Sequence, residues 1–161
     1  MTHSSKALDK KSTRKSSTNT RTFLLDSNVF IAAIKDPRKQ TETLKLLLRI
    51  IEDSDIKLVA DELLVEEMLR YAELLHSQTA TTIVAALIRK TRIVRAPENV
   101  RKICKTYIET PDKADILHAA TCLQTGATLI TNDRHFDRIR KQRIIEVWTI
   151  TEAINALQPS N

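Results

Sequence analysis

The sequence predicts an α/β protein in which a parallel sheet is covered by helices on both faces. From residue 22 onward, short apolar runs alternate with longer amphipathic segments, which is typical of strands linked by helices. The short runs are apolar at nearly every position, as expected for strands that are buried on both faces. The chain has a single glycine, Gly126, so it carries neither the glycine-rich loop of P-loop NTPases nor the glycine-rich turn of dinucleotide-binding enzymes.

The composition indicates one soluble domain. The chain has 161 residues, of which 42% are apolar and 29% are charged. No apolar run reaches the length of about 18 residues that a membrane span needs, and the N-terminus lacks the apolar stretch of a secretory signal. The two cysteines, Cys104 and Cys122, form no CxxC pair and are expected to be reduced thiols. We therefore expect a cytoplasmic protein with no membrane partner.

The net charge of +6 is concentrated at the N-terminus. Residues 1–21 hold six Lys or Arg side chains and one acid, a net of +5, so the rest of the chain carries +1. This segment is rich in Ser and Thr and nearly free of large apolar side chains, which predicts a disordered basic tail before a single domain over residues 22–158. Such a tail either raises non-specific affinity for nucleic acid or is only a solubilising extension.

The first part of the domain reads as a strand and two helices. Residues 23–25 predict a short buried strand, and Ser27 or Asn28 is expected to cap the helix that follows. Pro37 ends that helix because proline cannot continue it. Residues 40–53 form the next helix, with leucine and isoleucine on one face.

The middle of the chain repeats this order. Residues 56–60 predict the second strand, and Asp61 is a good N-cap for a long helix that runs to residue 75. Residues 79–90 are again helical. Residues 92–95 predict a brief third strand.

The C-terminal part begins with two helices. Pro97 suits the first turn of a helix over residues 97–107. Pro111 precedes the helix that carries Asp115, and Gly126 is expected to end that helix in a left-handed conformation.

The remaining elements complete the sheet. Residues 127–131 predict a strand, residues 133–141 a short helix and residues 144–147 a last strand. Thr151 is expected to cap a terminal helix over residues 152–157.

Carboxylates lie where several of these elements begin or end, and they are expected to converge beyond the carboxyl ends of the strands. The candidates are Asp26, one of Glu66 and Glu67, Asp115, and Asp133, with Asp137 one helical turn later as support. Clustered carboxylates repel one another unless a cation neutralises them, and hard oxygen ligands favour Mg²⁺ or Mn²⁺ over zinc. We expect His118 on a helix surface or behind the site, and His135 exposed.

Metal-bound carboxylates beside basic side chains indicate phosphodiester hydrolysis. Basic residues follow Asp133 directly and are the candidate RNA contacts: Arg134, Arg138, Arg140 and Lys141. Aromatic side chains make up only 4% of the chain, so recognition through the backbone and shape of RNA is expected more than base stacking. The simplest alternative is that the acids are only helix caps and first-turn residues.

Four segments together resemble the PIN-domain superfamily of nucleases: LLDSNVF, the acid-bearing helix after Ala60, DILHAATC and GATLITNDRHF. The resemblance covers about residues 22–150. It implies a three-layer α/β/α sandwich with a central parallel sheet of about five strands. It also implies an endoribonuclease that depends on Mg²⁺ or Mn²⁺.

The resemblance assigns roles to individual residues. Asp26, Asp115 and Asp133 match the metal-site acids, and Asn28 and Thr131 match polar positions that orient them.

The resemblance also bears on the second acid, which in the family lies about six residues past a Ser or Thr cap. Asp61 as the cap favours Glu67, whereas Ala60 as the cap points to Glu66. Glu67-Met68 also resembles the usual pair of a glutamate and an apolar residue, so we favour Glu67.

Partners follow from the same resemblance. Many small PIN proteins are toxins that are held by an antitoxin and are often dimeric. Apolar positions on two helices suit a homodimer interface or the core: Leu74, Leu75, Ile83 and Leu87.

Two other functions compete with a ribonuclease. The first is a catalytically silent PIN-like module that binds RNA or a protein, although a pure binder needs no cluster of carboxylates. The second is a receiver-like phosphorylation domain, which expects adjacent acids after the first strand and a lysine after a late strand. The chain has a single acid, Asp26, at the first place and Thr131-Asn132-Asp133 at the second.

Overall fold

A computed structural model describes residues 20–36, 39, 41–109 and 112–159. Its centre is a five-stranded sheet in the order β3-β2-β1-β4-β5, and every pair of neighbouring strands is parallel. The strands are β1 (Arg21–Leu25), β2 (Ile56–Ala60), β3 (Thr91–Ile93), β4 (Thr128–Ile130) and β5 (Val147–Trp148). The predicted fold class, an α/β/α sandwich around a parallel sheet, is confirmed.

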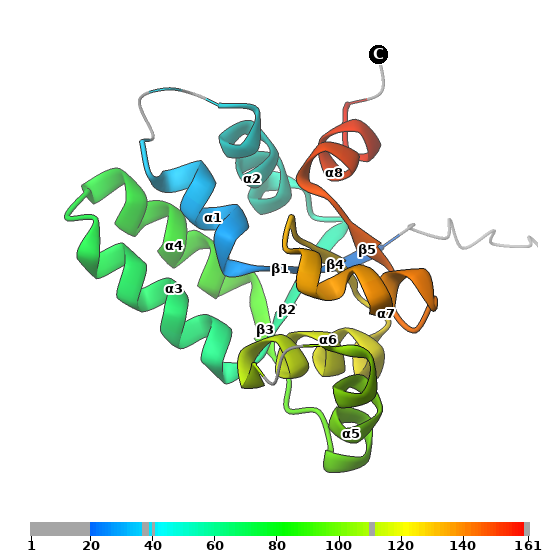
Figure 1. Cartoon of the computed structure of the whole chain (residues 1–161). Helices are drawn as coiled ribbons and strands as arrows, with labels where there is room; N and C mark the ends of the chain where they lie inside the picture. Colours follow the sequence, from blue (N-terminus) through cyan, green and yellow to red (C-terminus); the bar gives the residue numbers. More distant parts are fainter. Residues whose placement is uncertain (1–19, 37–38, 40, 110–111, 160–161) are drawn as a thin grey trace, which may run out of the picture.

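Helices connect the strands and cover the sheet. Figure 1 shows the first four helices gathered to one side of the sheet and α5, α6 and α7 on the other. The helices are α1 (Ser27–Ile34), α2 (Glu42–Glu52), α3 (Glu62–Leu74), α4 (Gln78–Lys90), α5 (Glu98–Tyr107), α6 (Lys113–Thr125), η2 (a 3₁₀ turn, Arg134–Phe136), α7 (Asp137–Lys141) and α8 (Ile150–Ala156). No helix in the described ranges is long and apolar enough to cross a membrane.

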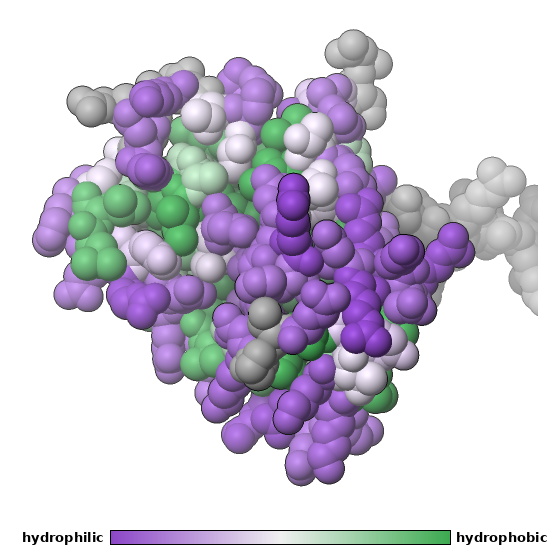
Figure 2. Space-filling model, viewed as in Figure 1, coloured by the Kyte–Doolittle hydropathy of each residue, from purple (hydrophilic) through white to green (hydrophobic). Residues whose placement is uncertain are grey.

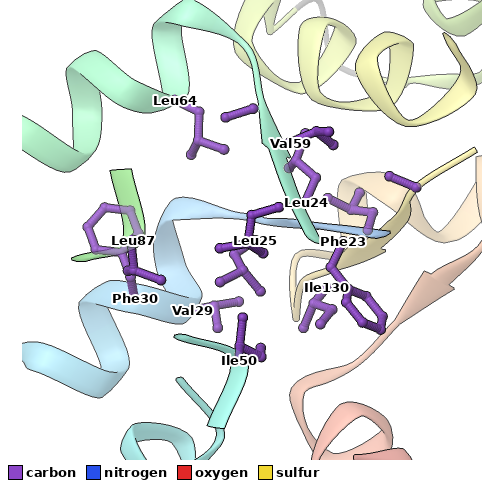
Figure 3. Close-up of a cluster of buried hydrophobic side chains, with 14 of the residues drawn as sticks. Phe23, Leu24, Leu25, Val29, Phe30, Ile50, Val59, Leu64, Leu87 and Ile130 are labelled. Atoms are coloured by element: carbon purple, nitrogen blue, oxygen red, sulfur yellow. The ribbon is translucent and has the colours of Figure 1, made fainter. Parts of the chain in front are cut away.

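The core surrounds β1, the central strand. Phe23, Leu24 and Leu25 are all buried, as expected for a strand covered on both faces. Figure 3 shows these side chains in one cluster with residues from β2, β4 and the helices that follow β1 and β2. Phe23 also packs on Trp148 of the edge strand β5, with ring centroids 5.4 Å apart. β1 is therefore the buried centre of the sheet.

Several local predictions agree with the structure. β2 has the predicted bounds, Asp61 caps α3 by accepting the backbone N–H of Leu64 at 2.9 Å, and Gly126 ends α6 with a φ of 74°. β1 begins at Arg21, one residue before the predicted start of the domain, and β3 occupies residues 91–93 instead of 92–95.

Two predicted helix caps were wrong. Asp26 caps α1, in place of Ser27 or Asn28, because its carboxylate accepts the backbone N–H of Ser27 at 2.7 Å. Thr149, and not Thr151, caps α8, because Thr149 forms a reciprocal capping box with Glu152.

Other boundaries differ because tertiary hydrogen bonds decide them. The last strand is Val147–Trp148 and not 144–147, since the N–H of Ile144 donates to the carbonyl of Ile139 and closes the end of α7. The predicted helix over 133–141 is divided into η2 and α7. Pro97 stands at the N-cap of α5, one position before the first turn. Residues 1–19, Pro37 and Pro111 lie outside the described residues.

Candidate metal centre

Two aspartates lie where the central strands end. Asp26 directly follows β1, and Asp133 lies three residues past the end of β4. β1 and β4 are paired in parallel, with Leu25 opposite Ile130, so their carboxyl ends meet at one edge of the sheet. Asp115 comes to the same edge from the first turn of α6.

The Asp26 carboxylate is buried, 5% exposed, and is held at both oxygens. Oδ1 accepts the backbone N–H of Ser27 at 2.7 Å, and Oδ2 accepts the hydroxyl of Thr131 at 2.7 Å. The same Thr131 oxygen accepts the backbone N–H of Asp133 at 3.0 Å. One hydroxyl therefore orients Asp26 and places Asp133 beside it.

Asp115, Asp133 and His135 form a group of potential metal ligands in the described part of the chain. One ligand atom from each lies within 4.8 Å of the others. His135 Nδ1 is 2.9 Å from Asp115 Oδ2 and 3.4 Å from Asp133 Oδ1. The backbone N–H of His135 donates to Asp133 Oδ1 at 2.9 Å, and this bond begins the η2 turn that brings the imidazole back over the acids.

The electrostatics of Asp115 show that these carboxylates are crowded. Burial raises the pKa of Asp115, the hydrogen bond with His135 lowers it, and the charges of Asp112, Asp133 and Asp26 raise it, with a net upward shift. The pKa of His135 is also raised, first by its hydrogen bond to Asp115 and then by the charge of Asp133. A crowded group of acids such as this suits a metal ion chemically, because a divalent ion neutralises the repulsion.

A second buried pair lies behind Asp26. His118 is 2% exposed, and its Nδ1 donates to Asp61 Oδ2 at 2.5 Å. Its Nε2 lies 3.9 Å from Asp26 Oδ1. Burial lowers the pKa of this imidazole, but the hydrogen bond to Asp61 and the charges of the surrounding aspartates outweigh burial and raise it. Asp61 therefore both caps α3 and ties α3 to α6.

Sequence reasoning missed the hydrogen-bond partners of both histidines. His118 was expected on a helix surface or behind the site, and it lies buried behind Asp26, the second of these positions. Its spacing of three residues from Asp115 was the available signal, since that spacing puts both side chains on one face of α6. The His135 side chain is 44% exposed, as expected, but its bond to Asp115 joins positions 20 residues apart and leaves no local signal.

The structure does not bring the remaining predicted acids into this hydrogen-bonded group. Glu67 lies 3.8 Å from Arg70 in an ion pair on α3, whereas Glu66 lines a separate cavity of about 170 Å³. Asp137 is exposed at the start of α7, and no hydrogen bond or ion pair found in the described residues joins it to the other acids. Asn28 is half-buried, and its Oδ1 is enclosed without a hydrogen-bond partner among the described residues.

The predicted RNA contacts lie on η2 and α7. Arg134, Arg138 and Lys141 are exposed, while Arg140 forms an ion pair with Glu152 at 2.7 Å. Figure 2 shows mainly hydrophilic atoms over the part of the surface where α7 lies in Figure 1. Exposed cations therefore lie on the two short helices that directly follow Asp133.

Comparisons with known proteins agree with this architecture. The sequence profile described as "PIN domain" matches residues 23–142. Comparison with curated proteins gave no match.

Solved structures share the fold at low sequence identity. VapBC2 from Rickettsia felis, bound to a DNA fragment from its promoter, is 16% identical with a TM-score of 0.55, and the match covers 80% of this chain and 98% of that chain. VapBC-1 from nontypeable Haemophilus influenzae is 19% identical with a TM-score of 0.55, over 81% of this chain and 98% of that one. FitAcB from Neisseria gonorrhoeae is 21% identical with a TM-score of 0.54, over 80% and 98%.

The family profile spans well over half of the chain, including Asp26, Asp115 and Asp133, and the sheet and helices have the corresponding fold. The chain therefore belongs to the PIN domain family.

Proposed function

We propose that the protein is a metal-dependent endoribonuclease that hydrolyses RNA phosphodiester bonds with Mg²⁺ or Mn²⁺. The observation that carries this proposal is the convergence of Asp26, Asp115 and Asp133 at one edge of the sheet, joined by the Thr131 hydroxyl and by His135. A protein that only bound RNA would gain nothing from buried carboxylates, which repel phosphate. Membership of a family whose domains are generally nucleases supports the same activity.

Asp26, Asp115 and Asp133 are the proposed catalytic and metal-binding acids, and Glu67 is the fourth. Glu66 shares its cavity with Lys113 and Leu117 of α6. Each of these lies two positions from Asp115, about 160° away around the helix. Glu66 therefore faces the side of α6 that is turned away from Asp115. This geometry favours Glu67.

A bound divalent ion would supply an activated water and neutralise the charge on the scissile phosphate and the leaving oxygen. The protein's part is to hold its ligands in place. Thr131 and the N–H of Ser27 orient the Asp26 carboxylate, and the His118 imidazole lies behind it, with Nε2 3.9 Å from Oδ1. Asn28 Oδ1 offers one more enclosed oxygen two residues after Asp26.

RNA is the proposed substrate because exposed cations adjoin these acids. Arg134, Arg138 and Lys141 take part in no ion pair found in the described residues, so they are available to phosphates. Arg140 is already paired with Glu152 and contributes less. These cations give affinity for the RNA backbone and little sequence discrimination.

A protein partner is proposed from the apolar surface of α3. Leu69 and Leu74 are 54% and 62% exposed, and Figure 2 shows apolar surface over the region where α3 and α4 lie in Figure 1. Ile83 and Leu87, also considered for an interface, are buried core residues. We infer that this surface binds an antitoxin or a second copy of the chain, since the VapBC and FitAcB structures share the fold. The protein would then be the toxin of a toxin–antitoxin pair acting in the cytoplasm, where its two free, buried thiols are compatible with reducing conditions.

The activity is tested with purified protein on a mixed pool of single-stranded and hairpin RNA in Mn²⁺, Mg²⁺ and EDTA. Asp26→Asn, which keeps an acceptor for Ser27, is expected to lower cleavage by about 10²–10³-fold, because metal assistance contributes several kcal/mol to the transition state. Asp55→Asn, an exposed carboxylate between α2 and β2, is the matched control and should cleave normally. Near-normal cleavage by Asp26→Asn would contradict the proposal. Tight RNA binding without cleavage in any metal would favour the silent module.

A further inference from the structure

We propose that His135 Nδ1 is a direct nitrogen ligand of the metal ion, and that the site therefore takes Mn²⁺ in preference to Mg²⁺. The proposal rests on the metal-dependent function above and deepens it by naming the class of ion. A site built only of carboxylates is hard and suits Mg²⁺, whereas an imidazole ligand strengthens binding of first-row transition ions.

The distances fit a shared coordination sphere. Neighbouring ligands of an octahedral ion with bonds of about 2.1 Å lie about 3 Å apart. His135 Nδ1 lies 2.9 Å from Asp115 Oδ2 and 3.4 Å from Asp133 Oδ1. Both distances from the imidazole nitrogen match neighbouring positions around a single ion, and one ligand atom from each of the three side chains lies within 4.8 Å of the others.

The backbone holds the imidazole in this place. Asp133 accepts the N–H of His135, and Thr131 accepts the N–H of Asp133. Thr131 also donates to Asp26, so the placement of His135 is tied to that of the most buried acid of the candidate centre. This chain of hydrogen bonds restricts His135 even though its side chain is exposed.

His135 has no other structural task in the described residues. Its side chain is 44% exposed, so it adds little to the core, and its hydrogen bonds and ion pairs are those to Asp133 and Asp115. Coordination would require Nδ1 without a hydrogen, so the neutral imidazole that binds an ion would carry its hydrogen on Nε2, and a proton on Nδ1 would leave to solvent.

Pulsed electron paramagnetic resonance of the Mn²⁺-loaded protein tests the assignment directly. We expect a hyperfine coupling to ¹⁴N, its replacement by a ¹⁵N coupling after labelling of histidine, and its loss in His135→Ala. His76→Asn is the matched control, because His76 has a φ of 47°, a left-handed conformation that asparagine adopts readily. The control should keep the coupling.

Calorimetric titration measures the preference between ions. His135→Ala is expected to weaken Mn²⁺ binding by about tenfold or more and to change Mg²⁺ binding far less. Bound Mn²⁺ without a nitrogen coupling in the parent protein would overturn the role of His135 and leave the proposed nuclease standing. A coupling that survives in His135→Ala would assign the nitrogen to another histidine. Failure to bind Mn²⁺ would remove the assignment of His135, and failure to bind either Mn²⁺ or Mg²⁺ would remove both proposals.

Discussion

The buried pair of Asp61 and His118 predicts strong energetic coupling between α3 and α6. His118→Leu leaves the Asp61 carboxylate, 4% exposed, without its cationic partner. Breaking a buried ion pair by removing one member costs about 3–5 kcal/mol of unfolding free energy. Asp61→Ser keeps the cap of α3, because a serine hydroxyl also accepts the Leu64 N–H. It leaves the His118 N–H without an acceptor, which costs about 1–3 kcal/mol of unfolding free energy.

The double variant should be far more stable than these two costs imply. With both groups replaced, no charge and no donor is left buried without a partner, and the cap remains. Replacing a whole buried ion pair is often neutral, so we expect a loss of about 1–2 kcal/mol relative to the parent protein. The coupling between the two sites is therefore expected to be at least about 2 kcal/mol.

Urea unfolding followed by far-UV circular dichroism measures all four proteins, just below the ordinary imidazole pKa of 6.5. Because the pKa of His118 is raised in the folded state, the pair's contribution is fully present below the unfolded pKa and is lost as pH rises through the folded one. The difference in unfolding free energy between the parent and the double variant should therefore shrink as pH rises. Additive single effects, or a gap independent of pH, would refute the coupled pair.

Three further predictions concern other parts of the molecule. Asp115→Asn should abolish cleavage yet stabilise the metal-free protein at neutral pH, because burial and neighbouring acids raise the Asp115 pKa and its charged form costs stability as pH rises through that value. The melting temperature of the variant should exceed that of the parent by an amount that grows as pH rises. A difference that does not change with pH would contradict this. Leu74→Asp, at a side chain that is 62% exposed, should leave the melting temperature nearly unchanged but prevent association with a second copy or an antitoxin. Light scattering after gel filtration measures the mass of the assembly, with Glu62→Asp at another exposed position as the control. An unchanged mass would exclude this surface as the interface. Gly126→Ala should lower the free energy of unfolding by about 1–2 kcal/mol, measured by thermal or urea unfolding. Its φ is 74° and an added Cβ meets nothing within 4 Å, so the whole cost is backbone strain. An unchanged free energy of unfolding would mean that the helix end relaxes.

The secondary structure was predictable where local patterns are strong. β2 was predicted with its observed bounds because its apolar run lies between acidic turn residues and the cap Asp61. β5 was misplaced because residues 144–147 are equally apolar, and only the bond from Ile144 to Ile139, with pairing to β4, selects the strand. The pattern shows that a segment can be a strand, but the neighbouring strand decides which residues pair.

Helix caps were predicted less well, for a related reason. Ser27, Asn28 and Thr151 are good capping residues by type. Asp26 and Thr149 take those places because the chain turns into each helix one or two residues earlier than the apolar pattern suggests. The difference matters at Asp26, since a single carboxylate both caps α1 and belongs to the candidate metal centre.

The sequence by itself determined the fold class, the parallel sheet and the placement of Asp26, Asp115 and Asp133 at its edge, because apolar periodicity and the residues that end each strand are local properties of the chain. Only the tertiary structure decided that His118 is buried against Asp61 and that His135 reaches Asp115, contacts that join positions 57 and 20 residues apart. The physical reason is that a polar side chain is buried only with a partner, and that partner depends on which distant segment packs against it.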